Sequence, residues 1–397
     1  MFGVLGNVRM RGMINMDPVE LLRKLVSINS VFPNEKIATE FIEMILIENG
    51  FNTSRLKISK DRFNIIGERG TEGRPIFFYG HIDTVPPYGE WQGDPFELRE
   101  DQNDKDKLIG LGAADMKAGV ASILKAVEEE TDRKIRVAFG VDEENISEGA
   151  YIIAKSGFLK DVEIGICTEI ASSKNQLLGP QAITLGRRGR CVLELEIPGK
   201  AAHGAQAENG INAICEAAKL IKELELLNNN LVLHELLPPP TQFIRKINAE
   251  STSLSLPETA IIELDIHMVT PETPESVVKS TQEFIDSLYI RGVFSEIDGK
   301  RIKVKLKERR IPYLLPYVTP KENPYVKILS RIILEKIGEP VYNYGTSVAD
   351  ENIFAANGIP MISIGPNGGN EHASNEWVSK ISYLKLIDIL KTFIRSC

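Results

Sequence analysis

The sequence lacks several signatures that would assign it at once to a structural class. Its cysteines are widely scattered and include no C-x-x-C pair: Cys167, Cys191, Cys215 and Cys397. This spacing argues against a disulfide framework and a thiolate metal site, and it indicates a reducing, cytoplasmic location. No apolar run reaches the roughly 18 residues of a membrane-spanning helix, so we expect no membrane partner.

An excess of basic residues is also missing. The formal net charge is −8, which argues against nucleic acid or an anionic membrane surface as the main partner. Hydrophobic residues make up 43% of the chain and charged residues 26%, as in an ordinary globular protein. A chain of 397 residues is too long for one ordinary core, so the length predicts two domains.

Short apolar runs alternate with helical patterns over much of the chain. The runs are "NIIG" (64–67), "PIFFYG" (75–80), "RVAFGV" (136–141), "VEIGIC" (162–167) and "PMISIG" (360–365). Continuous rather than alternating hydrophobicity is typical of strands that are covered on both faces. The pattern therefore predicts an α/β fold, with a central sheet and helices on both of its faces.

The stretch from 190 to 308 has a different rhythm. It begins with the alternating "CVLELEIPG", and its order of strands and helices reads β-α-β-β-α-β, which indicates a small α+β domain with one exposed sheet face. Because "PMISIG" follows it, we expect an insertion that divides the larger domain into residues 1–189 and 309–397. An exposed sheet face or edge needs a cover, which favours a homodimer through the inserted domain.

Potential metal ligands follow four of the apolar runs, and another acid precedes a helical stretch. They are His81 and Asp83, Glu143 and Glu144, Glu169, His372, and Asp115 in "GLGAADMKAGV". Ligands of open α/β sheets bind beyond the carboxyl ends of the strands, so we expect these side chains to converge. Uncompensated carboxylates would repel one another there, and one or two divalent cations would remove that cost. Imidazole and carboxylate without thiolate suit zinc, cobalt or manganese.

These motifs carry a family resemblance. The chain resembles the metallohydrolase family of aminoacylase, acetylornithine deacetylase, succinyl-diaminopimelate desuccinylase and glutamate carboxypeptidase. The matching pieces, in the family's order, are "GHIDTVPP", "GLGAADMKAGVAS", "VDEENISEGA", "TEIASS", "LGRRGR", "GKAAHGAQAENGINAI", "LDIHMVTPET", "GTSVADENIF" and "GPNGGNEHASNEWV". The resemblance implies a mixed, zinc-peptidase-like central sheet, and it makes the insertion a lid and dimerisation domain.

The resemblance also implies a role for each ligand. Two metal ions, zinc with cobalt or manganese as alternatives, would share Asp115. One ion would also bind His81 and Glu169, and the other Glu144 and His372. Further roles would be orientation of His81 by Asp83, general base catalysis on a metal-bridging water by Glu143, and polarisation of the substrate carbonyl across a dimer interface by His203.

Other residues lie in stretches that the family uses near the substrate: Arg187, Arg188, Asn209, His267 and Thr346. His267 stands where most members have an arginine that meets the substrate carboxylate, and Arg190 replaces a small serine typical of the desuccinylases. Without the resemblance, Arg187 and Arg188 would read as a solvated basic turn and His203 as a surface histidine.

We therefore expect metal-dependent hydrolysis of the amide bond of an N-acyl amino acid, with a dipeptidase or carboxypeptidase as the alternative within the family. A non-catalytic metal-binding relative would be expected to lack the base or the bridging acid, and both Glu143 and Asp115 are present. A nicotinamide oxidoreductase is disfavoured, because "GLGAAD" lacks the third glycine of a dinucleotide fingerprint and follows the charged "DQNDKDK".

Overall fold

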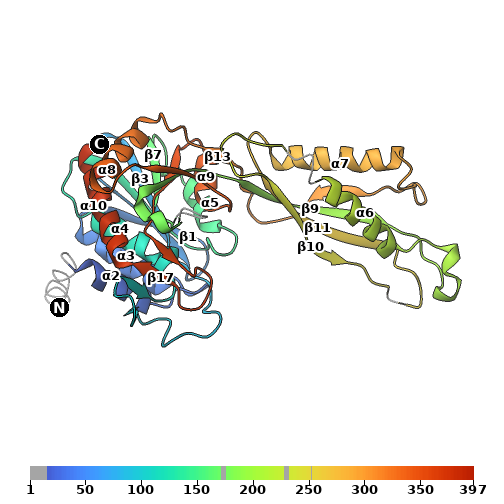
Figure 1. Ribbon diagram of the computed structural model, residues 1–397, viewed down its shortest axis with the longest axis horizontal. Helices are drawn as coiled ribbons and strands as arrows, with labels where there is room; N and C mark the ends of the chain where they lie inside the picture. The colour runs from blue at the N-terminus through green and yellow to red at the C-terminus, as the bar shows by residue number, and fades with distance from the viewer. Residues whose placement is uncertain (1–15, 171–175, 228–231, 252) are drawn as a thin grey trace. The chain divides into compact units, whose positions relative to one another are not determined.

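The computed structural model describes residues 16–170, 176–227, 232–251 and 253–397, and it divides into two compact units (Figure 1). The first unit is Met1–Arg187 with Val318–Cys397, and the second is Arg188–Tyr317. Residues 309–317, expected in the larger domain, thus belong to the second unit. The reason is local pairing: the Arg190 N–H donates to the Leu314 carbonyl at 2.9 Å, and the Tyr313 hydroxyl donates to the Val192 carbonyl at 3.2 Å.

The first unit is built on a mixed sheet with the strand order β1-β2-β6-β3-β7-β15-β8-β13, and β14 pairs with β8. Its strands are β1 (Asn52–Lys57), β2 (Phe63–Arg69), β3 (Glu72–His81), β6 (Arg133–Gly140), β7 (Ile164–Cys167), β8 (Ala182–Arg187), β13 (Tyr317–Val318), β14 (Val341–Gly345) and β15 (Met361–Ser363). β3 runs parallel to β6 and β7, whereas β2 runs antiparallel to β1 and β6. The expected mixed central sheet is confirmed.

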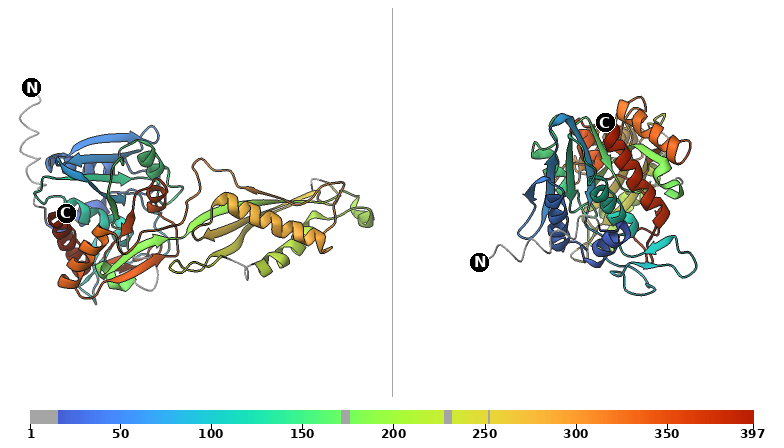
Figure 2. Two further views of the ribbon diagram at one scale, coloured as in Figure 1. Left: turned by 90° about the horizontal axis from the view of Figure 1, so that it is seen from above. Right: turned by 90° about the vertical axis from the view of Figure 1, so that its left-hand side faces the viewer.

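Helices cover both faces of this sheet, as the side chains of β3 show. Phe77 and Tyr79 pack against Phe354 of α9, whereas a Cβ at Gly80 would point toward Val120 of α4. The helices of the unit are α2 (Pro18–Ser27), α3 (Lys36–Glu48), α4 (Ala118–Ala126), α5 (Glu148–Lys155), α8 (Pro324–Lys336), α9 (Glu351–Ala356) and α10 (Lys380–Ser396). α10 packs beside α4 and α8 in one layer, and α5 packs beside α9 in the other (Figures 1 and 2).

A small sheet joins two distant segments of the first unit. Its order is β16-β17-β5-β4, formed by β4 (Arg99–Glu100), β5 (Lys107–Ile109), β16 (Gly368–Gly369) and β17 (Trp377–Ser379). β17 pairs antiparallel with β5, so that Trp377 lies opposite Ile109. The loop that carries Asp115 therefore follows β5, and the loop that carries His372 leads into β17, the neighbour of β5.

The second unit has the expected β-α-β-β-α-β order. Its elements are β9 (Gly189–Pro198), α6 (Ala213–Leu227), β10 (Thr241–Asn248), β11 (Thr259–Met268), α7 (Pro274–Ile290) and β12 (Lys303–Leu306). The strands pair antiparallel in the order β10-β11-β9-β12, and one face buries a core against α6 and α7. The opposite face carries ion pairs such as Lys305–Glu194 at 2.7 Å and Lys307–Glu263 at 2.6 Å.

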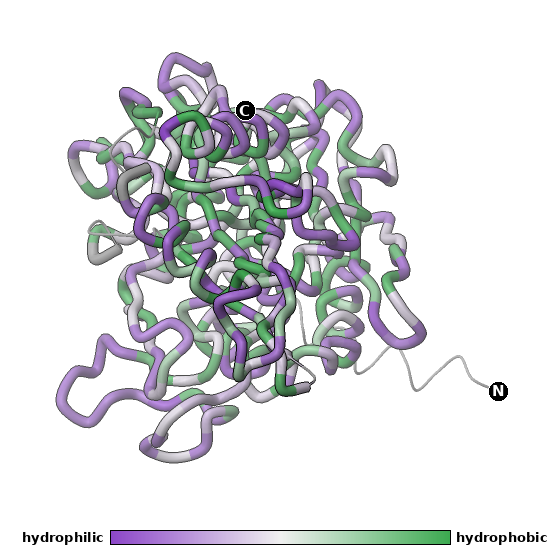
Figure 3. The backbone as a smooth tube through the Cα atoms, turned by 90° about the vertical axis from the view of Figure 1, so that its right-hand side faces the viewer, coloured by the Kyte–Doolittle hydropathy of each residue, from purple (hydrophilic) through white to green (hydrophobic). Residues whose placement is uncertain are grey.

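Polarity follows burial along the chain. The core strands are hydrophobic, whereas the outermost loops are mostly hydrophilic (Figure 3). Over the described stretches of the chain, every helix is too short or too polar to cross a bilayer.

α4 lies very close to the segment after β7 at Gly119. A Cβ placed there would lie 2.2 Å from the carbonyl oxygen of Thr168 and 2.8 Å from its hydroxyl oxygen. Both atoms are well inside van der Waals contact, and the carbonyl belongs to the backbone just after β7. Only glycine lets the helix that follows Asp115 reach the segment that carries Glu169.

We expect Gly119→Ala to lower the free energy of unfolding by about 1–3 kcal/mol, the usual cost of overpacking a core. Urea denaturation followed by circular dichroism measures this change. Gly67→Ala is the matched control, because the added methyl would meet only side-chain carbons of Phe51 and Val137 at 3.3 Å. Equal stabilities for the two variants would contradict the close packing at Gly119.

Candidate active site

Three neighbouring parallel strands end at one edge of the sheet, and each is followed by a candidate ligand. β3 ends at His81, opposite Gly140 at the end of β6, and Tyr79 lies opposite Cys167 at the end of β7. Glu143 and Glu144 follow β6, and Glu169 follows β7. The parallel register is what brings these side chains together.

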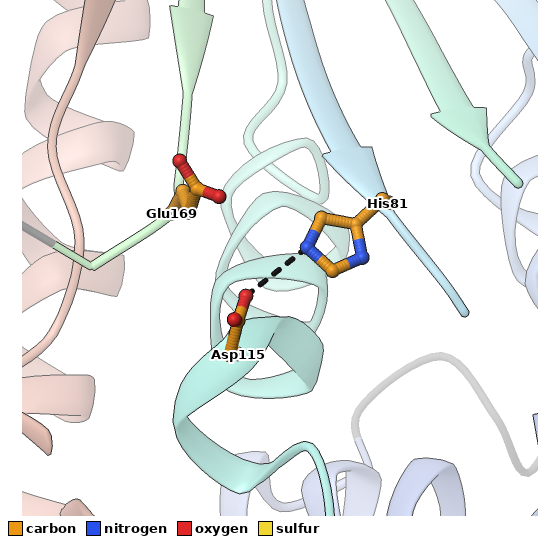
Figure 4. A group of neighbouring side chains, drawn as sticks. All are labelled: His81, Asp115 and Glu169. Carbon is orange, nitrogen blue, oxygen red and sulfur yellow. Dashed lines mark hydrogen bonds and ion pairs between the residues drawn. The ribbon is translucent and has the colours of Figure 1, made fainter. Parts of the chain in front are cut away.

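Asp115 lies between the two imidazoles. Its Oδ1 is 3.1 Å from Nε2 of His81 (Figure 4), and its Oδ2 is 3.2 Å from Nε2 of His372. Asp115 belongs to the short η1 (Ala113–Lys117), whose irregular backbone at Asp115 and Met116 precedes α4. His372 also approaches Glu144, with Nε2 3.0 Å from Oε2.

Three groups of side chains bring their ligand atoms within 4.8 Å of one another, which is close enough to hold a metal ion. They are His81, Asp115 and Glu169; Asp115, Glu144 and His372; and His81, Glu143 and Glu144. The first two groups share Asp115, and they contain the residues that the resemblance assigns to each metal. The third adds Glu143, the predicted base.

The donor chemistry of His81 fits a metal ligand. Nδ1 lies 3.1 Å from the backbone carbonyl oxygen of Asp83, an acceptor that places the proton of a neutral ring on Nδ1. The lone pair of Nε2 then faces a carboxylate oxygen of Asp115, so two acceptors confront each other at 3.1 Å. Protonation of the ring, whose pKa the neighbouring carboxylates raise, or a divalent metal ion between the two atoms resolves this conflict.

Burial makes the acids of the site costly to ionise. It raises the pKa of Glu169 to about 8 and that of Asp83 to about 7, and it raises the pKa of Glu143 well above its usual range. Hydrogen bonds to Asp115 and Glu144 raise the pKa of His372 to about 11. A site with this excess of buried carboxylates fits divalent cations.

Asp83 contacts His81 in a different way from the expected one. The backbone carbonyl accepts the hydrogen bond at 3.1 Å, whereas the nearer carboxylate oxygen, Oδ1, lies 3.7 Å from Nδ1. The other carboxylate oxygen accepts the Glu144 N–H at 3.0 Å. In this structure the Asp83 side chain therefore fixes the backbone of the glutamate loop, while its carbonyl orients the imidazole.

A buried ion network anchors the same loop. Asp142 has a φ of 79°, an uncommon value for a residue other than glycine. Its Oδ1 is 2.9 Å from Nη2 of Arg62, which also binds Glu35 at 2.6 Å. Its Oδ2 accepts the Glu148 N–H at 3.2 Å. These contacts hold the turn from which Glu143 and Glu144 project.

Arg187 is buried instead of forming a solvated basic turn. Its guanidinium pairs with Glu169 and, through Nε at 3.1 Å, with Glu351. It also lines a cavity of about 300 Å³ together with Asp115, Glu169, Ile170, Ser347, Glu371 and His372. Arg187 therefore lies in the site, but its contacts there are with acids of the protein.

The remaining predicted residues lie elsewhere. Thr346 is exposed just after β14, and the others belong to the second unit. There, Nη1 of Arg188 donates to the Pro239 carbonyl at 2.7 Å, and Nδ1 of His267 lies 3.4 Å from the Thr241 hydroxyl. Burial and the charge of Arg188 lower the pKa of His267 to about 4.

His203 caps the short η3 (Gly204–Asn209), which ends at Asn209. Nδ1 of His203 accepts the Ala205 N–H at 3.1 Å, so a neutral ring carries its proton on the exposed Nε2.

Sequence reasoning missed several residues beside the site: Ser347, Glu351, Glu371 and Glu376. Glu351 and Glu376 are almost fully buried, with 0% and 2% of their surface exposed. The signal for Glu376 was available, because "NEWV" places an acid at the start of a short strand four residues after His372. No local pattern marks Glu351, which follows another acid in "ADEN" as a surface residue would.

Comparison with known proteins gives consistent relatives. The model of peptidase family M20/M25/M40 matches residues 77–396. A succinyl-diaminopimelate desuccinylase of Wolbachia pipientis wMel is 28% identical over 398 residues, covering 96% of this chain and 94% of the relative.

Two solved structures share the fold. A tripeptidase from Staphylococcus aureus aligns with a TM-score of 0.73 at 20% identity, over 95% of this chain and 98% of the other. A dinuclear metal-binding peptidase of the M20 family from Bacillus subtilis aligns with a TM-score of 0.69 at 18% identity, over 96% and 97%. Since the family match spans most of the sequence and the residues of the site lie within or just after its strands, the chain belongs to peptidase family M20/M25/M40 and is a metal-dependent hydrolase of amide or peptide bonds.

Proposed function

We propose that the chain hydrolyses the amide bond that joins an acyl group to the nitrogen of an amino acid. The observation that carries this proposal is the position of Asp115, which offers one carboxylate oxygen to each of two imidazoles at 3.1 and 3.2 Å. The desuccinylase name of the Wolbachia relative supports an acyl group on the amino acid nitrogen. The tripeptidase with the same fold supports the alternative, a short peptide.

Two divalent cations would share Asp115 in this proposal. One would also bind His81 and Glu169, and the other would bind Glu144 and His372, because these are the groups whose ligand atoms lie within 4.8 Å. Zinc is the ion we expect, with cobalt or manganese as alternatives for the same donors. Bound at these positions, the cations would lower the pKa of water and polarise the scissile carbonyl.

Glu143 would move the proton. Its carboxylate lies near His81 and Glu144 but outside the two groups that share Asp115. Burial raises its pKa, so the carboxylate is a stronger base than one exposed to solvent. It would accept a proton from the attacking water and return it to the leaving amine.

The second unit would supply most of the substrate contacts. Arg190 is engaged by Asp265 in a bidentate pair at 2.9 and 2.6 Å, which offsets its charge. Arg188 instead donates to a carbonyl and to the Thr241 hydroxyl, beside His267. We assign the free carboxylate of the substrate to Arg188 and His267, with Asn209 and Thr346 as further contacts.

A homodimer through the second unit completes the proposal. β10 is an edge strand, and its Phe243 and Ile247 are 51% and 47% exposed. Pairing of this edge with its copy would cover part of both side chains, with the exposed Arg245 and Lys246 of β10 beside them. His203, a proton donor through Nε2, would then polarise the substrate carbonyl in the site of the partner. We place the enzyme in the cytoplasm, since its four cysteines are all free thiols.

A substrate screen with metal removal tests the function directly. Acetyl-, succinyl- and glutamyl-type amino acids and dipeptides would be offered with zinc, cobalt or manganese after exhaustive dialysis against a chelator. We expect no turnover without metal and hydrolysis of at least one N-acyl amino acid with it. Turnover of dipeptides alone would replace the deacylase proposal with the peptidase alternative. Full activity in metal-free protein, verified by elemental analysis, would refute both.

Substitutions of the two adjacent glutamates should impair the enzyme in different ways. Glu143→Gln should retain both metals and lower kcat by about 10²–10⁴-fold, because it removes the proton acceptor. Glu144→Gln should release one metal, and added metal should restore part of its activity. Metal content by elemental analysis and steady-state kinetics measure both effects. The assignment is reversed if Glu143→Gln loses metal while Glu144→Gln keeps it and is inactive.

Mixed dimers test the role of His203. His203→Ala and Glu143→Ala chains would each be inactive alone. Their heterodimer should show about half of the wild-type activity, because one of its two sites combines an intact Glu143 with an intact His203 from the partner. Differently tagged chains allow the heterodimer to be isolated and its activity measured. An inactive heterodimer would mean that His203 works within its own subunit or takes no part.

A further inference from the structure

Glu376 is a buried carboxylate that the proposed reaction does not use. It lies between His372 and β17 and has only 2% of its surface exposed. Its Oε1 accepts the N–H groups of Ala114 and Asp115 at 2.8 and 2.9 Å, and its Oε2 accepts that of Gly112 at 2.7 Å.

A fourth hydrogen bond ties the backbone of Glu376 to the same loop. Its carbonyl oxygen accepts the N–H of Gly110 at 3.0 Å. Four amides of the segment 110–115 are therefore satisfied by one residue that lies 261 positions away from Asp115. In a regular helix or sheet, backbone carbonyl groups would accept the hydrogen bonds of these N–H groups. In this irregular segment, Glu376 provides the acceptors instead.

The surroundings compensate the charge of Glu376. The partial positive charges of three amides converge on the carboxylate where η1 begins. Burial lowers the pKa of the neighbouring Lys117 to about 7, and the charge of Glu376 acts against that shift. Nζ of this lysine donates to the Ile28 carbonyl at 2.9 Å. Burial raises the pKa of Glu376 to about 8, and the three amide hydrogen bonds act against that rise.

The contacts of Glu376 join the two metal loops. On one side, the backbone N–H of Asp115 donates to Oε1 of Glu376, which fixes the backbone position of Asp115. On the other, Glu376 is four residues from His372 and enters the small sheet through β17. The distances from Asp115 to the two imidazoles depend on both loops at once.

We infer that Glu376 is a positioning residue, which holds the Asp115 backbone against the His372 loop so that one carboxylate serves both metals. This inference rests on the proposed metal roles of Asp115 and His372. It predicts coupled behaviour: disturbing Glu376 should weaken both metal sites together, although Glu376 binds neither ion. Outer hydrogen-bond partners of metal ligands typically change metal affinity by about 10–100-fold.

Glu376→Gln is the primary test. Glutamine has the same shape, but its amide group would present hydrogens to an N–H donor of the loop, so at least one hydrogen bond becomes a repulsion. We expect the zinc dissociation constants of both sites, measured by competition with a chromophoric chelator, to rise by about 10–100-fold. Excess zinc should restore most of the kcat, while KM changes little.

Glu163→Gln is the matched control. Glu163 is a partly buried acid of the first unit that binds Arg133 at 2.7 Å and contacts Tyr325, and it has no part in the metal groups. Its loss should lower stability without changing zinc affinity. Glu376→Asp serves if the glutamine variant does not fold, because it keeps the charge and shortens the reach, and it should also weaken both sites.

Three results would overturn the inference: unchanged zinc affinity in a folded Glu376 variant, weakening of only one site, or equal weakening in Glu163→Gln. The zinc measurement does not require catalysis, so it remains decisive if the proposed substrate is wrong. Failure of the proposed function would appear separately, as an active Glu143→Gln enzyme.

Discussion

The concentration of buried acid at one edge of a parallel sheet is the constraint on which the rest of the first unit depends. Glu143 and Glu169 meet there because adjacent parallel strands end together, and Asp115 joins them from η1; low solvent exposure makes such buried carboxylates costly to ionise. Cations between the acids relieve the repulsion. The fold thus brings together several carboxylates whose mutual repulsion favours the binding of cations.

Arginines and backbone amides stabilise the acids at this edge of the sheet. Arg62 pairs with Asp142, which precedes Glu143, and Arg187 pairs with Glu169. The backbone N–H groups of the 110–115 segment donate to Glu376. Each contact is buried and uses a charged or convergent donor, so it loses little strength to water. Together they fix ligand directions before a cation arrives, which reduces the reorganisation that binding requires.

Much of this arrangement follows from the sequence, because its signals are local. Buried runs that end in His81, Glu143 and Glu169 predict strands whose polar ends meet, and the structure has those strands. The partners beyond the ligands depend on contacts between distant segments. Pairing of β17 with β5 places Glu376 at the Asp115 loop, and no periodicity in either segment encodes that pairing. Likewise, Nδ1 of His81 lies 3.1 Å from the carbonyl oxygen of Asp83 and 3.7 Å from its carboxylate oxygen. The residue types alone do not specify which of these two oxygens accepts the hydrogen bond.

The two edges of the sheet in the second unit differ in chemistry. Both edges carry exposed basic residues, Lys303 and Lys305 on β12 and Arg245 and Lys246 on β10, but β10 also presents the exposed Phe243 and Ile247. Lysine along an edge strand discourages the addition of another strand, because its charge would be brought against the incoming chain. Because β10 adds exposed apolar side chains, which favour pairing, the sheet can add a copy of itself along that edge and then stop. The same asymmetry that permits a closed pair therefore protects the protein from growing into a filament.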